Sequence, residues 1–288
     1  MSEQTGFAKM TPGQWVLRVL QGILIGVGAM LPGISGGALC VLFGIYQPMM
    51  ALLSHPFKAF KKYFLLFVPV VIGVGLGFVG SGKLLATFFE ANEFLMLCLF
   101  LGLIIGVFPS LFREAGMQGR TKKGKASLAV SFLIMLTILL TFKYGIKMEI
   151  KPSFGWYVVC GIVWGLSMVV PGLSSSNFLL FLGLYAPMSA GIGNLDLTVL
   201  LPMILGFIPT ILGLSHPLNA LFEKKYEIAY HAIIGTVFAS TILIIPTSYP
   251  DVGMVLIGIL LAATGFFFAL WMDKWSEGMK AKEAAKSN

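Results

Sequence analysis

Two stretches of this chain decide its fold: residues 30–37, MLPGISGG, and residues 169–176, VVPGLSSS. Each lies near the middle of a run without Asp, Glu, Lys or Arg, and these runs cover residues 19–57 and 152–195. A membrane-spanning helix needs about 20 apolar residues, so each run has about twice the length of one crossing. A turn between two full crossings would lie in headgroups or water, where charged residues are usual. Because both turns are small and uncharged, we predict re-entrant helical hairpins whose tips lie inside the bilayer.

The composition outside these runs is that of a membrane protein. Hydrophobic residues make up 57% of the chain and charged residues 11%, with a mean hydropathy of +0.91, whereas a soluble domain carries roughly a quarter charged residues. Six further apolar runs each fit one crossing: Tyr63–Gly82, Phe94–Phe112, Ala126–Phe142, Leu197–Leu214, Ile228–Tyr249 and Val252–Met272. We therefore expect an all-α integral membrane protein, with a single transmembrane domain at residues 1–272 and a cytoplasmic tail at residues 273–288.

The two broken runs are related in sequence. Pro32-Gly33 matches Pro171-Gly172, and GIYQPM at residues 44–49 matches GLYAPM at residues 183–188, with one constant offset and no gap. The repeat continues downstream, where Pro69, Gly73, Gly80, Leu85, Phe89 and Gly102 match Pro202, Gly206, Gly213, Leu218, Phe222 and Gly235. A shared Pro-Gly-x-Ser followed at fixed spacing by Gly-x-Tyr-x-Pro-Met is hard to obtain by chance, so we infer an internal duplication.

The duplication divides the chain into two halves of the same construction. We predict one half at about residues 15–125 and the other at about 126–272, with the hairpins at residues 15–54 and 155–190. Each half is one hairpin plus three crossings, so the number of crossings per half is odd and the second half enters the membrane upside down. Such an inverted repeat is common in secondary transporters, which bind their ligand near the bilayer midplane between the halves.

The charged loops predict the orientation. With the N-terminus inside, every strongly basic segment falls on the cytoplasmic side: Lys58, Lys61 and Lys62; Arg113, Arg120, Lys122, Lys123 and Lys125; Lys224 and Lys225; and the tail. The outer loops hold Lys83, Glu90 and Glu93; Lys147, Glu149 and Lys151; Asp196; and Asp251. This distribution follows the positive-inside rule, so we expect both termini in the cytoplasm.

The breaks carry groups that bind anions. A helix that restarts after Pro-Gly-x-Ser has free backbone N–H groups and a favourable dipole, and glycine lets a ligand approach closely. The candidate ligand-binding residues are Pro32, Gly33, Ser35, Gly36 and Gly37 in the first break, and Pro171, Gly172, Ser174, Ser175, Ser176 and Asn177 in the second. The alternative is that Pro and Gly only kink the helices while Ser packs them closely.

A helix end contributes only about 0.3–2 kcal/mol to holding an anion, so we also expect a cation near the breaks. Lys83 and His216 stand at matched positions of the two halves and are the first candidates. Each could instead be an ordinary interfacial residue, with Lys83 snorkelling to the headgroups. Arg18 and Arg113 are secondary candidates, because their positions in the sequence fit anchoring at the cytoplasmic face better than ligand binding.

Other kinds of chemistry find little support in the sequence. The three cysteines lie inside apolar runs without paired spacing, so we expect neither a disulfide nor a metal site. The net charge of +8 is spread over short loops, as membrane topology requires, and nucleic acid is not expected as a partner. We expect no catalytic residue and no cofactor.

The paired motifs, together with Lys83-Leu84-Leu85 and residues 194–197, NLDL, resemble a prokaryotic membrane family long of unknown function, the PopT-type polyprenyl-phosphate transporters. The resemblance covers about residues 15–272. It implies translocation, or flipping for recycling, of undecaprenyl phosphate or a related lipid carrier across the cytoplasmic membrane of a prokaryote. This chain departs from the family in lacking an acidic residue before Pro32, in having Ser175 where glycine is common, and in having His216 where lysine is common.

Two rival functions remain open. The same breaks resemble those of membrane polyprenyl-pyrophosphate phosphatases, but hydrolysis needs a nucleophile or an activated water together with charge neutralisation. Residues 19–54 and 152–195 contain no Asp, Glu, Lys, Arg or His, so binding without chemistry is favoured. A carrier for a small soluble anion is the second rival.

Overall fold

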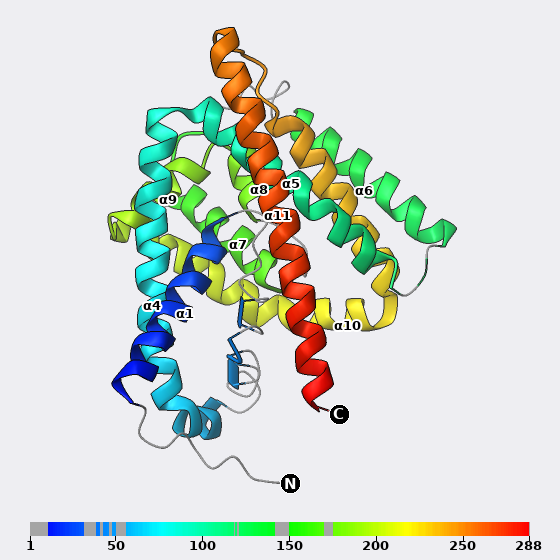
Figure 1. The fold of residues 1–288 in the computed structure, drawn as a ribbon. Coiled ribbons are helices and arrows are strands. Elements are labelled where there is room, and N and C mark those ends of the chain that lie inside the picture. The colour runs from blue at the N-terminus through cyan, green and yellow to red at the C-terminus, as the bar shows by residue number, and fades with distance from the viewer. Residues whose placement is uncertain are drawn as a thin grey trace.

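The computed structural model describes residues 11–31, 39–40, 43–45, 48–49, 56–117, 119, 121–141, 150–169 and 175–287. The tips of both predicted hairpins therefore lie outside the described residues. The described part is all helical (Figure 1). Its helices are α1 (Pro12–Met30), α4 (Pro56–Ala91), α5 (Glu93–Ala115), α6 (Lys122–Leu140), α7 (Phe154–Val169), α8 (Ser175–Phe181), α9 (Tyr185–Gly193), α10 (Leu197–Ile244) and α11 (Val252–Ser287).

Seven helical segments within the described part are long and apolar enough to cross a membrane, and six of them overlap the six predicted crossings. Helix α10 contains two of the six, joined at Lys225, where the backbone leaves the helical region (φ −141°, ψ 42°). The seventh is α1, which the sequence predicts only as one arm of a hairpin. The chain is thus a multi-pass membrane protein, with a first arm of full crossing length.

Short polar side chains begin several helices at their N-termini, where the first backbone N–H groups lack helical partners. Thr11 starts α1 with a capping box that includes Gln14, and Pro12 follows at the first helical position. Asn92 accepts a hydrogen bond from the backbone N–H of Leu95 at 3.0 Å and begins α5. Asp196 does the same for α10, and its hydrogen bonds from Thr198 hold the pKa of this carboxyl below its usual range.

Glycines set matching helix crossings in the two halves. A Cβ atom at Gly22 of α1 would clash with the carbonyl oxygen of Val70 in α4, and a Cβ at Gly161 of α7 would clash with that of Met203 in α10. The reciprocal glycines clash in the same way, Gly73 with Val19 and Gly206 with Val158. All these positions correspond in the sequence repeat. The α1–α4 and α7–α10 pairs therefore pack backbone to backbone in one register.

The two halves also exchange their third crossings. Helix α6 lies mostly beyond the predicted boundary at residue 125, but it is the third crossing after the first hairpin. It packs on the second part of α10, and α11 packs on α5 (Figure 1). Gly235 lies against Leu128 and Gly102 lies against Ala262, and the two glycines are again repeat mates. Each half thus supplies a helix that covers the other, an interlocking that the sequence did not predict.

A further turn follows each of the two predicted breaks. Helices α8 and α9 meet at 113°, and the turn between them uses Gly183 at φ +67°, a conformation that favours glycine. The N–H of Leu184 donates to the carbonyl of Leu179 at 2.9 Å, which closes the end of α8. Gly44 has φ +66°, and the N–H of Ile45 donates to Cys40 at 2.8 Å. The sequence predicts only one break per hairpin, so this turn is an addition, and it occurs in both halves.

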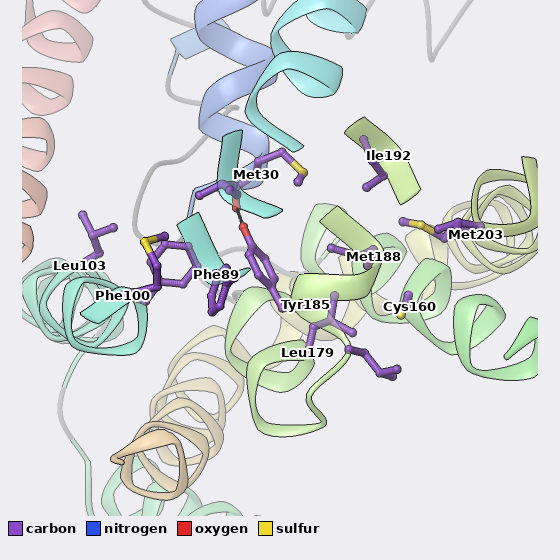
Figure 2. Close-up of a cluster of buried hydrophobic side chains, with 14 of the residues drawn as sticks. Met30, Phe89, Phe100, Leu103, Cys160, Leu179, Tyr185, Met188, Ile192 and Met203 are labelled. Atoms are coloured by element: carbon purple, nitrogen blue, oxygen red, sulfur yellow. Dashed lines mark hydrogen bonds between the residues drawn. The ribbon is translucent and has the colours of Figure 1, made fainter. Parts of the chain in front are cut away.

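The largest buried cluster joins the halves. Met30, Phe89 and Phe100 come from the first half, and Leu179 and Tyr185 from the second, all nearly inaccessible (Figure 2). The Tyr185 ring lies 5.3 Å from that of Phe100, and its hydroxyl donates a 2.5 Å hydrogen bond to the carbonyl of Met30. Met30 is the last residue of α1, so this bond ties the end of α1 to the second hairpin.

Candidate functional site

The described part of the predicted anion site is the start of α8. This helix begins at Ser175, where the sequence predicts the chain to become helical again after the second Pro-Gly. Ser175, Ser176 and Asn177 are all buried, and Asn177 has an exposed fraction of 0%. Three consecutive polar side chains are thus enclosed next to the predicted break, in a segment surrounded by apolar helices.

Asn177 is unusual because its carboxamide has no partner. Neither the side-chain nitrogen nor the oxygen makes a hydrogen bond, although both are buried. Buried polar groups almost always have partners, and leaving one unpaired costs about 1–3 kcal/mol. The position of Asn177 therefore fits a residue that meets a polar ligand or water.

Unpartnered atoms gather in this one region. The described residues contain four buried side-chain nitrogen or oxygen atoms without a partner, and they belong to Trp164, Asn177 and Ser189. Buried hydroxyls elsewhere are paired within their own helix: Ser240 and Thr241, for example, donate to the carbonyl of Val237 at 3.0 and 2.6 Å. The second hairpin is thus where buried hydrogen-bonding capacity is left unused.

Most residues of the two predicted breaks lie outside the described part of the structure. These are Pro32, Gly33, Ser35, Gly36, Gly37, Pro171, Gly172 and Ser174. Their role in anion binding stays a prediction from the sequence.

Lys83 lies beside the C-terminal end of α9. A Cβ atom at Gly193 would clash with the backbone nitrogen of Lys83, and one at Gly82 would lie 2.9 Å from the carbonyl oxygen of Ser189. The Lys83 side chain itself is exposed. The two sequence features that resemble the family, around Lys83 and around Asp196, are thereby brought to the same end of α9, whereas Ser175 begins α8 on the other side of the bend.

The other predicted cations, His216, Arg18 and Arg113, lie on different helices. His216 lies within α10, and its side chain is outside the described atoms. Arg18 donates to the carbonyl of Phe43 at 2.8 Å and to Gln21 at 3.0 Å, so it holds the turn at Gly44. Its contacts give it a structural role in the first hairpin.

Arg113 pairs with the acidic residues of α11. Its guanidinium lies 2.8 Å from Asp273 and 2.6 Å from Glu277, and its side chain is about half exposed. Nearby, Glu227 accepts hydrogen bonds from the backbone and the hydroxyl of Thr121. These contacts join segments that the sequence analysis places on the cytoplasmic side, and the role of Arg113 as an anchor of that face stays a prediction.

Trp164 and Tyr185 are the residues of this region that the sequence analysis missed. Both look like packing aromatics in the sequence, and only the three-dimensional contacts distinguish them. Tyr185 belongs to the repeated Gly-x-Tyr motif, which was a usable signal. Trp164 has no counterpart in the other half, so repetition could not have revealed it.

Metal chemistry has no site among the described residues, which contain no group of three or more His, Cys, Asp or Glu side chains able to hold an ion. Cys40 and Cys160 are buried, and Cys98 is partly buried; all three are free thiols.

Comparison with known proteins identifies a family whose sequences resemble this chain. The sequence family described as VCA0040-like, undecaprenyl phosphate translocase-like, matches residues 25–254. The polyprenyl-phosphate transporter of Vibrio cholerae serotype O1 is 22% identical over 234 residues, which cover 75% of this chain and 73% of that protein. The polyprenyl-phosphate transporter of Staphylococcus aureus is 24% identical over 274 residues, 91% of this chain and 96% of that protein. No solved structure matches the chain. The similarity extends through both halves.

Proposed function

The chain belongs to the VCA0040-like family of undecaprenyl phosphate translocase-like proteins, and we propose that it translocates undecaprenyl phosphate or a related polyprenyl phosphate across the cytoplasmic membrane. Two relatives that carry the name polyprenyl-phosphate transporter support this proposal. The structural observation that carries it is the enclosed polar segment, Ser175 to Asn177, with unused hydrogen-bonding capacity in a multi-pass membrane protein.

The physical task matches this arrangement. A lipid phosphate must carry its charge across hydrocarbon, where an unpaired charge is very unfavourable. Its polyprenyl tail can stay in the lipid throughout. The protein therefore needs only a polar site between its helices to replace the water around the headgroup, and the broken hairpins supply one.

The proposed architecture is an inverted repeat with re-entrant hairpins. It is supported by the matched glycine crossings, the matched turns at Gly44 and Gly183, and the reciprocal packing of α6 and α11. In this arrangement the tips near Pro32 and Pro171 approach the midplane from opposite sides. Both termini face the cytoplasm, and residues 1–272 form one domain.

The proposed headgroup site consists of both breaks. Backbone N–H groups near Gly36 and Gly37, and near Ser175 and Ser176, donate to the phosphate oxygens. Lys83 and His216 act as flanking cations that receive the headgroup as it enters or leaves. Because Lys83 lies at the far end of α9 and is exposed, its contact with the lipid belongs to an outer position rather than to the break.

We propose a transporter rather than an enzyme. Residues 19–54 and 152–195 offer no acidic, basic or imidazole group to activate water or to protonate a leaving oxygen. The purified chain should therefore release no phosphate from a polyprenyl diphosphate. Release above background that disappears in Ser35→Ala or Ser174→Ala would favour the phosphatase instead.

The test of the function is translocation in sealed vesicles that contain the purified chain. Labelled polyprenyl phosphate is placed in one leaflet, and its appearance in the other is followed beside vesicles without protein. Inorganic phosphate trapped inside the vesicles measures the small-anion alternative. Movement of the lipid but not of inorganic phosphate supports the proposal, and movement of inorganic phosphate alone would contradict it.

A further inference from the structure

Among the residues that the structure describes, the buried polar atoms without partners all belong to the second half. At the constant offset of the hairpin repeat, Trp164 aligns with Ile25 and Asn177 with Ala38. Ser189, the third such residue, aligns with Met50, and its hydroxyl lies within reach of that of Tyr185, one turn earlier in α9. Each unpaired polar residue thus stands where the first half has an apolar side chain.

The chemistry of the two side chains points to an acceptor. An indole N–H can only donate, and a carboxamide offers two further N–H donors and one acceptor oxygen. Trp164 Nε1 and both polar atoms of Asn177 are buried without a partner. A phosphate group carries several acceptor oxygens, and hydrogen bonds to a charged group are the stronger ones.

Both residues are packed against neighbouring helices. The Trp164 ring packs edge-on against Phe78 of α4, with ring centroids 4.9 Å apart and an interplanar angle of 76°. Asn177 is fully enclosed on α8, and α7 and α8 pack on one another. In the sequence, Trp164 precedes and Asn177 follows the second Pro-Gly, Pro171-Gly172.

We propose that the headgroup site is asymmetric: the Trp164 indole N–H and the Asn177 carboxamide bind the lipid phosphate, and the first half contributes no equivalent side chains. This proposal rests on the proposed function and makes it more specific. The matched positions of the first half, Ile25 and Ala38, have no hydrogen-bonding side chain that could play this part.

The direct test follows the indole N–H itself. The full chain, with ¹⁵N-labelled tryptophan, is purified in detergent and gives one indole signal for each of its five tryptophans; Trp164→Phe assigns one of them and Trp156→Phe assigns a control in the same helix. Undecaprenyl phosphate is then compared with undecaprenol, which has the same tail without the phosphate. The Trp164 signal should shift with the phosphate and stay in place with the alcohol, while the Trp156 signal responds equally to both.

Asn177→Leu supplies the second arm, because it removes both unpaired atoms while keeping the number and branching of the side-chain heavy atoms. The Tm without ligand should stay the same or rise, since a structural Asn would be needed for folding and an unpaired one is not. The affinity for undecaprenyl phosphate should fall roughly 10- to 100-fold. Leu179→Ala, which cuts an apolar side chain from the same helix, should lower the Tm instead.

The outcomes separate this inference from the function. If wild type binds undecaprenyl phosphate but the Trp164 signal does not move, and Asn177→Leu binds normally, the asymmetric site is wrong while the function stands. A lower Tm with unchanged affinity in Asn177→Leu would likewise make Asn177 structural. If wild type neither binds nor moves the lipid, the proposed function fails, and the asymmetric site fails with it.

Discussion

The two halves of this protein share a backbone design but differ in the side chains beside their breaks. The crossing glycines correspond, as Gly22 and Gly161 do, and so do the turns at Gly44 and Gly183. Around the second break, however, Trp164 and Asn177 stand where the first half has Ile25 and Ala38. The two halves thus share the glycines that shape the helices, whereas the polar side chains that we propose to bind the ligand stand in the second half and not at the matched positions of the first.

The largest effect is expected when a side chain is placed between two helices that pack backbone to backbone. Gly22→Val and Gly161→Val would each push a side chain into the backbone of the partner helix, and each should destabilise the fold by about 3 kcal/mol or more. Thermal unfolding in detergent measures the effect. The matched controls are Gly80→Ala and Gly213→Ala, which have open space around them and should be neutral or slightly stabilising. Unequal losses at Gly22 and Gly161 would mean that the two crossings are not equivalent.

A substitution at Lys83 tests whether this lysine of the first half contributes to binding of the lipid. Lys83→Ala should weaken binding of undecaprenyl phosphate by about 1.5–3 kcal/mol, because it removes a charge-assisted contact. The measurement is a binding titration, with Lys151→Ala, another exposed lysine of the predicted outer face, as its control. Equal affinities for wild type and Lys83→Ala would remove Lys83 from the headgroup path.

The turns should respond equally in the two halves. Gly44→Ala and Gly183→Ala place a Cβ atom at positive φ, which costs about 1–2 kcal/mol per residue. Neither glycine has an atom near its missing Cβ, so strain of the backbone is the only penalty. If only one of the two substitutions lowered the stability in the same unfolding measurement, the two turns would not contribute equally to the stability of the fold.

The smallest effect concerns the bond that ties the halves together. Tyr185→Phe removes the hydrogen bond to the carbonyl of Met30 and keeps the ring in the core, so it should destabilise the fold by about 0.5–1.5 kcal/mol. Tyr249→Phe, at an exposed tyrosine, is the control. An unchanged Tm in Tyr185→Phe would mean that water replaces the lost donor.

Much of this fold was predictable because its signals are local. Apolar runs of crossing length located six crossings in five helices, and recurring glycines revealed the repeat before any contact was known. The start of α8 at Ser175 followed from the Pro-Gly break, and the burial of Ser175 to Asn177 agrees with a site inside the protein.

The remaining features depend on contacts between distant segments. The exchange of α6 and α11 leaves no mark in the sequence, because helices that face lipid and helices that face each other are equally apolar. The bend at Gly183 could not be predicted, because glycines in apolar runs occur at helix crossings as well as at turns. The unpaired state of Trp164 could not be foreseen either, since it depends on the absence of an acceptor among residues far away in the sequence.

One measurement tests most directly whether both breaks approach the lipid headgroup. It is the rate at which polyprenyl phosphate moves between the leaflets of vesicles that contain wild type, Gly36→Trp or Ser175→Trp. A bulky side chain at either position fills the space that the phosphate needs, so both variants should lose translocation while purifying as folded protein. If both variants move the lipid at the wild-type rate, the headgroup does not pass the breaks, and a phosphate site at the two hairpins is contradicted.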